Sequence, residues 1–269
     1  MLPELFYRSW VPQRSKLTLV TLHGAGQHSG LFRDLGTHCS QQSIAVYAPD
    51  LRGFGQSKGK RGHVYSFLEY LEDLDHFIGH VRKIHPDDPV FLMGHSMGGT
   101  IVVRYGQERR SSVQGAILLA PALKIRPFIP KSVLYPLYVL SRVAPELSFD
   151  LTRWGKALSA ICQFEFSDTI SEDADPLSIN RFTARWCTEL LMNARQAMSR
   201  ANQFRIPVLC LCGEEDPVVD PAAIEQFHNL LQVPDKRFLL LPYAKHRLLQ
   251  DHNRQHVYEH IMKWLKERV

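Results

Sequence analysis

The stretch VFLMGHSMGGT, residues 90–100, decides the fold of this chain. Residues 90–93 form an apolar run that is typical of a buried strand, and residues 100–105 continue as an apolar helical stretch. Ser96 lies between them in a G-x-S-x-G pattern, which places it in a tight strand-to-helix turn. A Cβ on Gly94 or Gly98 would collide across such a turn, and the serine would be held in a strained conformation with its hydroxyl pointing outward.

Other short apolar runs recur along the chain. The expected strands are residues 17–22, 44–48, 90–93, 116–119, 208–212 and 238–241. The expected helices are residues 31–41, 66–85, 98–109, 221–231 and 254–268. Near-continuous apolar runs with amphipathic stretches between them are typical of a parallel sheet covered by helices on both faces. The sequence therefore predicts an α/β fold with a mostly parallel central sheet of about seven or eight strands.

One interval breaks this alternation. The segment between residues 119 and 207 is far longer than the connection that normally joins a strand to its helix. We expect residues 1–120 and 206–269 to form the core and residues 121–205 to form an inserted helical cap. Within the cap, helical stretches are expected around residues 151–164 and 180–200.

Composition excludes several classes of protein. Of 269 residues, 45% are hydrophobic and 22% are charged, as in ordinary globular chains. No apolar run is long enough to span a bilayer and no signal-peptide pattern opens the chain, so a cytoplasmic location is expected. The net charge of +5 is dispersed, which argues against a nucleic-acid partner and mildly favours anionic surfaces. The five cysteines are an odd number and are expected to be reduced.

A serine hydroxyl becomes a useful nucleophile only beside a base, so later residues must supply one. Asp216 follows the run 208–212 at the edge of the sheet where sites in such folds lie, with Glu214 and Glu215 as alternatives. His246 follows the last expected strand. The order serine, acid, histidine predicts a Ser96–His246–Asp216 triad.

An oxyanion hole requires two backbone amides aimed at one point. One should come from Met97, directly after the serine, and the other from Ala25, in the glycine-flanked turn after the strand at residues 17–22.

Two other readings compete with a hydrolase. The turn from Gly24 to Ser29 nearly matches a dinucleotide-binding fingerprint with Asp50 as the ribose-binding acid, but Ser29 replaces the last glycine and the serine motif would be left unexplained. His252, His256 and His260 could line one helical face as metal ligands, but no acidic or cysteine ligand accompanies them. We expect neither a metal nor an organic cofactor.

With these residues in place, the chain resembles the α/β-hydrolase superfamily, in particular its monoacylglycerol lipase and lysophospholipase branch. The resemblance is carried by three stretches, HGAGQHSG at 23–30, DLRGFGQS at 50–57 and GHSMGG at 94–99. It implies serine esterase chemistry on a lipid with one acyl chain, an acyl tunnel under the cap, and an oxyanion hole from Ala25 and Met97. The first strand of the usual eight-stranded sheet is expected to be missing.

The resemblance also shows departures around the headgroup. Leu31 and Leu249 stand where monoacylglycerol lipases hold glycerol through an arginine and a histidine, and Gln27 replaces a glutamate. Apolar side chains cannot satisfy the glycerol hydroxyls, which weakens the case for that headgroup.

The cap segment 128–140 is apolar almost all round, so it must be buried or touch lipid. Leu134, Leu137 and Tyr138 are candidate substrate-binding residues in it. Lys124, Arg126, Lys131 and Arg142 flank it, which suits either the inner lining of a lid or peripheral contact with an anionic membrane. A short-chain carboxylesterase, a thioesterase, an amidase and a non-catalytic lipid-binding protein remain alternatives on the same scaffold.

Overall fold

A seven-stranded sheet forms the centre of the computed structural model, which describes residues 5–109, 113–126, 129–151, 175–252 and 254–269. Its strands are β1 (Tyr7–Trp10), β2 (Leu17–Leu22), β3 (Ile44–Pro49), β4 (Val90–His95), β5 (Gly115–Leu119), β8 (Val208–Gly213) and β9 (Lys236–Leu241). Their order is β1-β3-β2-β4-β5-β8-β9, and every pair is parallel except β1 with β3. The α/β prediction is confirmed.

The strands differ in burial, and only the buried strands are recognisable in the sequence as apolar runs. Residues of β2, β3, β4, β5 and β8 are buried throughout, because helices cover both faces of the sheet. The edge strand β1 is partly exposed and carries Arg8, so it has no apolar run and was not among the expected strands.

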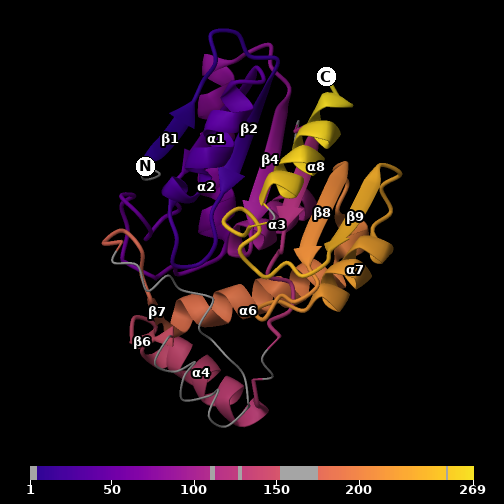
Figure 1. Ribbon diagram of the computed structural model, residues 1–269. Helices are drawn as coiled ribbons and strands as arrows, with labels where there is room; N and C mark the ends of the chain where they lie inside the picture. The colour runs from indigo at the N-terminus through magenta and orange to yellow at the C-terminus, as the bar shows by residue number, and fades with distance from the viewer. Residues whose placement is uncertain (1–4, 110–112, 127–128, 152–174, 253) are drawn as a thin grey trace.

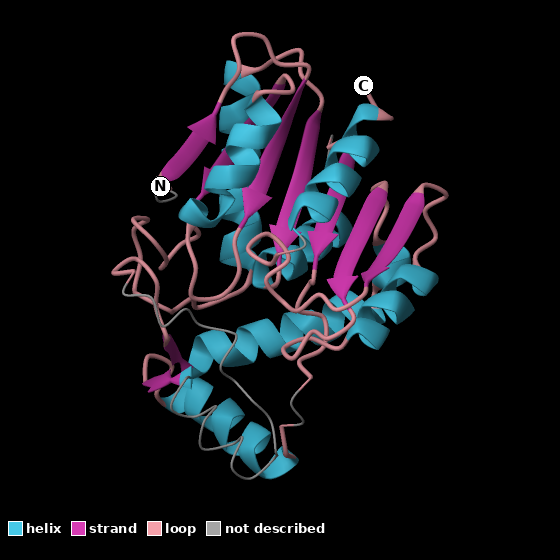
Figure 2. Ribbon diagram, in the orientation of Figure 1, coloured by secondary structure: helices cyan, strands magenta, loops and turns pink. Residues whose placement is uncertain are grey.

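Helices cover both faces of the sheet, as Figure 2 shows. They are α1 (Arg33–Ser40), α2 (Leu68–Ile84), α3 (Met97–Glu108), α7 (Pro221–Leu230) and α8 (Arg254–Lys266), with the short 3-10 turns η1 (Ser29–Phe32) and η2 (Ala201–Gln203). Helices α1 and α8 lie on one face, and α2, α3 and α7 lie on the other (Figure 2). The helix expected from residue 31 begins as the turn η1 and becomes α-helical at Arg33.

Between β5 and β8 the chain forms a separate layer beneath the sheet. Its elements are α4 (Lys131–Val143), the hairpin strands β6 (Ser148–Asp150) and β7 (Arg181–Thr183), and α6 (Ala184–Ser199). Helix α6 runs across the carboxyl ends of the strands (Figure 1). Buried Arg104 of α3 donates to Asn193 and Gln196 of α6, at 3.1 and 2.9 Å, and so joins this layer to the core.

One expectation for the cap is wrong, and another concerns residues that lie outside the described ranges. Residues 181–183 were expected to be helical but form β7, and α6 begins only at Ala184, where the Thr183 hydroxyl accepts a hydrogen bond from the Trp186 amide as an N-cap. The helix expected at 151–164 lies outside the described residues except for Leu151.

The four described cysteines are free thiols, as expected from the sequence. Burial raises the pKa of Cys39, Cys187 and Cys212 to about 12, which keeps these thiols protonated. In the described part of the chain, the helices are all too short or too polar to cross a membrane.

Candidate active site

Ser96 stands at the turn between β4 and α3 in a conformation that few residues adopt. Its backbone angles are φ 53° and ψ −117°, in a strained region for a residue with a side chain. A Cβ on Gly94 would lie 2.3 Å from the carbonyl oxygen of Gly98, and one on Gly98 would lie 2.3 Å from that of Leu22. Only glycine fits at both positions, as the motif predicts.

The side chains of Ser96, His246 and Asp216 form one hydrogen-bonded row. Ser96 Oγ lies 3.0 Å from His246 Nε2, and His246 Nδ1 lies 2.8 Å from Asp216 Oδ2. The other carboxylate oxygen of Asp216 accepts the amides of Val218 and Val219, at 2.8 and 2.9 Å. These bonds fix the fully buried carboxylate toward the imidazole.

The structure also distinguishes Asp216 from the two alternatives that the sequence left open. Glu214 and Glu215 are exposed at the end of β8, whereas Asp216 turns inward. The acid that meets His246 is therefore Asp216.

His23 secures the loop that carries Ala25. Its Nδ1 donates to the carbonyl of Gly24 at 2.8 Å, and its Nε2 accepts the amide of Leu51 at 2.9 Å. This arrangement requires a neutral ring with one N–H. Complete burial lowers the pKa of His23 to about 4, so the neutral form is the stable one at neutral pH.

A second buried histidine, His95, links the same loop to the loop of His246. In the neutral ring, Nε2 donates to the carbonyl oxygen of His246 at 3.0 Å, and the unprotonated Nδ1 lies 3.2 Å from the side-chain amide of Gln27. Burial, followed by repulsion from His246, lowers the pKa of His95 to about 3. Gln27 Oε1 also accepts the Gly24 amide at 3.1 Å, so Gln27 is a structural support for the loop.

An apolar cleft of about 140 Å³ opens beside Ser96. Ala25 and Met97, the predicted oxyanion residues, line it together with Ser96 and His246. Its apolar side chains are Ile125, Leu151, Phe182, Trp186, Leu190 and Val218. Most of these come from the layer beneath the sheet, which explains why sequence motifs did not indicate them; only the helical spacing of Trp186 and Leu190 could have done so.

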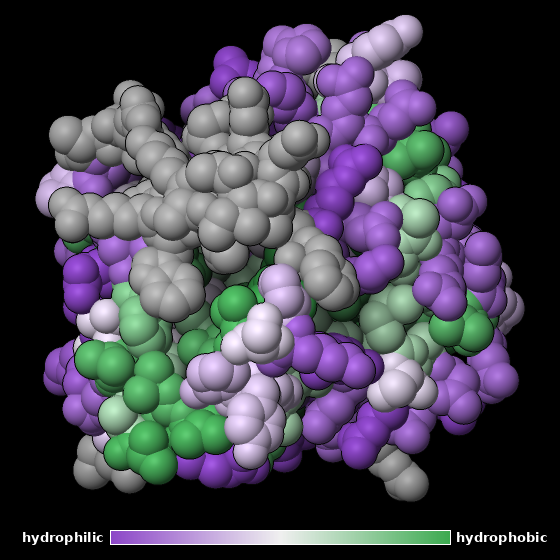
Figure 3. Space-filling view, turned by 90° about the horizontal axis from the view of Figure 1, so that it is seen from below, coloured by the Kyte–Doolittle hydropathy of each residue, from purple (hydrophilic) through white to green (hydrophobic). Residues whose placement is uncertain are grey.

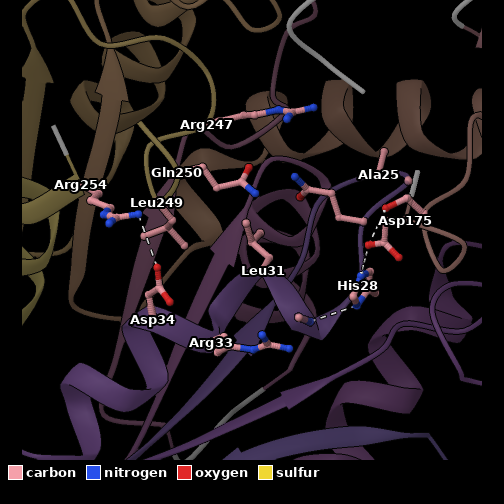
Figure 4. A pocket seen from close by; sticks show the side chains of 14 residues that line it. Ala25, His28, Leu31, Arg33, Asp34, Asp175, Arg247, Leu249, Gln250 and Arg254 are labelled. Atoms are coloured by element: carbon pink, nitrogen blue, oxygen red, sulfur yellow. Dashed lines mark hydrogen bonds and ion pairs between the residues drawn. The ribbon is translucent and has the colours of Figure 1, made fainter. Parts of the chain in front are cut away.

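The predicted substrate-binding residues separate into two groups. Gln27 lines this cleft, and Gln27, Leu31 and Leu249 line a second cavity of about 490 Å³ beside it (Figure 4). By contrast, Leu134, Leu137 and Tyr138 are absent from the described lining of both cavities. The sequence did not indicate Arg247, which lines both cavities and directly follows His246.

The competing interpretations do not fit the described residues. Asp50 is fully buried and accepts the amides of Ser29 and Gln56, at 2.6 and 2.8 Å, so it is not available to a ribose. Among the described residues, no group of three or more His, Cys, Asp or Glu side chains could hold a metal. His256 instead lies 3.3 Å from Glu259 on the surface of α8.

A serine at a strand-to-helix elbow, with its histidine and acid on loops after later strands of a mostly parallel sheet, defines the α/β-hydrolase class. The chain belongs to the family described as serine aminopeptidase, S33, whose model matches residues 13–253.

Similarity to individual proteins extends over nearly the whole chain. Human monoglyceride lipase is 30% identical, over 98% of this chain and 88% of its own length. Phospholipase YtpA of Bacillus subtilis is 28% identical, over 93% and 95%. The crystal structure of Paleococcus ferrophilus monoacylglycerol lipase superposes with a TM-score of 0.83 at 27% identity, covering 99% of this chain and all of that one. The chain is thus related to lipases and esterases.

Proposed function

We propose that this protein is a serine hydrolase that cleaves carboxylic esters of lipids with a single acyl chain. The observation that carries the proposal is the row of Ser96 Oγ, His246 and Asp216, joined at 3.0 and 2.8 Å beside an apolar cleft. The names of the relatives, monoglyceride lipase and phospholipase, support a lipid ester as the substrate.

In the proposed mechanism, His246 Nε2 takes the proton of Ser96 as Oγ attacks the ester carbonyl. The amides of Ala25 and Met97 stabilise the oxyanion, and Asp216 holds the imidazole and stabilises its cation. His246 then gives the proton to the leaving alcohol, leaving Ser96 acylated. Water, deprotonated by the same histidine, releases the acid and restores the serine.

The test of the nucleophile is Ser96→Ala. It should lower turnover about 10⁴-fold or more, equivalent to roughly 5 kcal/mol of barrier, while the circular dichroism and the melting temperature stay near those of the wild type. Esterase activity retained in this variant would refute the assignment.

A short-chain carboxylesterase is the second candidate, and the size of the cleft favours it. The described residues enclose about 140 Å³ beside Ser96, a space that suits a short acyl group. A rate series over esters of two to sixteen carbons separates the candidates. An optimum at two to four carbons would leave the mechanism intact and reject the lipid substrate.

Helix α4 supports a proposal of peripheral membrane contact. Tyr135, Val139 and Val143, spaced four residues apart on one face, are 74%, 44% and 73% exposed, whereas Leu134 and Leu137 are half-buried. Apolar side chains gather on the cap side of the molecule (Figure 3). Lys131 and Arg142 are exposed on the same helix, and their charge suits an anionic bilayer.

A further inference from the structure

The amide of Ala25 belongs to a peptide unit whose other half is the carbonyl of Gly24. In a trans peptide the N–H and the C=O point in opposite directions, so whatever holds the carbonyl also aims the amide. The Gly24 carbonyl accepts the Gln27 amide at 3.3 Å, in addition to the ring N–H of His23. These bonds lie within the turn, so they aim the amide correctly only while the rest of the turn, up to His28, keeps its place.

One stretch of the cap, residues 175–179, holds that side of the turn. Gly26 has a φ of +77°, and its carbonyl accepts the amide of Ile179 at 2.9 Å. The approach is close, since a Cβ on Gly26 would lie 2.5 Å from the carbonyl oxygen of Ile179. Two residues further on, His28 Nε2 lies 2.6 Å from the carboxylate of Asp175. The turn that carries the oxyanion amide is thus tied to the cap at two points.

The direction of the bond between His28 and Asp175 follows from the other partners of the ring. His28 Nδ1 accepts the amide of Gly30 at 3.1 Å, so the proton of the neutral ring lies on Nε2, which donates to Asp175 (Figure 4). Asp175 also accepts the amide of Leu177 at 2.9 Å and the hydroxyl of Ser178 at 3.3 Å. One carboxylate therefore shapes the cap stretch and binds the oxyanion turn at the same time.

The direction of the Ala25 amide matters because hydrogen bonds weaken steeply when the angle at the hydrogen falls toward about 120°. A small rotation of the peptide between Gly24 and Ala25 would weaken the bond to an oxyanion. It would destabilise the transition state more than the bound substrate, whose carbonyl is still uncharged. Loss of the cap contact should therefore slow the chemical step and leave substrate binding nearly unchanged.

We propose that Asp175, acting through His28, is a positioning residue for the oxyanion hole, and that it holds the Ala25 amide in the direction of the developing oxyanion. This role rests on the function proposed above, because the oxyanion forms only during that reaction. The Asp175 side chain is 37% exposed, so its truncation leaves no void in the core and the variant should fold.

The experiment measures the hydrolysis of 4-nitrophenyl hexanoate and of its thiono analogue, in which sulfur replaces the carbonyl oxygen. Sulfur is a weak hydrogen-bond acceptor, so the ratio of kcat/KM for the two esters reports on the oxyanion hole. Asp175→Ala should lower kcat for the oxygen ester about tenfold with little change in KM, because the donor is displaced rather than removed. The oxygen-to-sulfur ratio should fall by about threefold or more, and this ratio does not depend on the fraction of the enzyme that is folded.

Two further variants separate positioning from a general effect on the fold. Asp175→Asn keeps an oxygen that can accept the hydrogens of His28 and Leu177, so its kcat should stay within about threefold of the wild type. His28→Asn keeps a side-chain acceptor for the Gly30 amide but is too short to reach Asp175, so it should reproduce the loss seen in Asp175→Ala. The double variant of Asp175→Ala and His28→Asn should lose no more activity than either single variant.

Glu146→Ala is the matched control. Glu146 also joins the cap to the core, through an ion pair with Lys60 and a hydrogen bond from the Tyr65 hydroxyl at 2.7 Å. It carries the same charge as Asp175, but its partners lie on a loop that does not carry Ala25. Its loss should leave kcat and the oxygen-to-sulfur ratio at their wild-type values.

The outcomes separate this role from the proposed function. An unchanged kcat in Asp175→Ala, or equal losses on the two esters, would overturn the positioning role and leave the hydrolase standing. An equal fall of the ratio in Glu146→Ala would also overturn it, because any contact between cap and core would then have the same effect. A wild type that hydrolyses neither ester would refute the proposed function and the positioning role together.

Discussion

Acid should destabilise this protein through two buried histidines, His23 and His95. Their pKa values are held at about 4 and about 3, against 6.5 for a free imidazole, mainly because burial removes the charged form from water. Above pH 6.5 both rings are neutral in the folded and unfolded chains, so their burial does not make the free energy of unfolding depend on pH. Below pH 6.5 the unfolded chain binds a proton at each of the two histidines, whereas the folded chain does not, so the free energy of unfolding falls.

The size of the loss in stability follows from the pH range over which only the unfolded chain is protonated. From pH 6.5 to pH 5 the unfolded state gains about 1.4 kcal/mol per pH unit for each histidine, or about 2 kcal/mol each. The two together should lower the free energy of unfolding by about 4 kcal/mol, a large share of the roughly 5–15 kcal/mol typical of a domain.

Urea unfolding at pH 7 and pH 5, followed by tryptophan fluorescence and circular dichroism, measures the difference. His95→Gln removes one of the two groups, so its difference between the two pH values should shrink by about 2 kcal/mol, whatever its stability at pH 7. His76→Gln, at an exposed position on α2, is the matched control and should keep the wild-type difference. A wild-type free energy of unfolding that is equal at both pH values would refute the reasoning, as would an unchanged difference in His95→Gln.

Four further outcomes are expected. Gly98→Ala should cost about 3 kcal/mol or more in urea unfolding, since its Cβ would lie 2.3 Å from a backbone oxygen; a wild-type midpoint would show that the turn can relax. Asp216→Asn should lower kcat about 10⁴-fold with little change in KM, and a loss under tenfold would remove it from the triad. Gln27→Leu leaves the Gly24 amide without its acceptor and should lower the free energy of unfolding by about 1–3 kcal/mol, measured by thermal unfolding. An unchanged free energy of unfolding would contradict this role of Gln27. Val143→Asp should abolish flotation with anionic liposomes, and Leu137→Asp should reduce it less because Leu137 is half-buried. Equal flotation of the wild type and Val143→Asp would show that α4 does not contact the membrane.

The sequence predicted the core because its signals are local. A strand buried on both faces must be apolar throughout, so β2, β4 and β8 are visible as short runs. The glycines beside Ser96 are visible because the turn admits no other residue. The edge strand β1 has neither signal, and it owes its place to pairing with β3.

The surroundings of the site depend on contacts between distant segments, which a single sequence does not reveal. Phe182 on β7 and Trp186 on α6 reach the cleft because the chain between β5 and β8 folds beneath the sheet, and the sequence does not show which part of the core this layer covers. The apolar segment 128–140 was recognised, but which of its side chains are exposed depends on packing against α6. Arg247 likewise gains its place between the two cavities only from the fold of the loop after β9.

The most direct test of the central claim is labelling by a fluorophosphonate, which reacts only with a serine activated by its base. We expect one label per chain, located on Ser96 by peptide mass mapping, and about 10³-fold slower labelling in His246→Ala, in line with the loss of a triad base. Labelling of Ser96 at an equal rate in the wild type and His246→Ala, or no labelling of a folded wild type, would contradict the account.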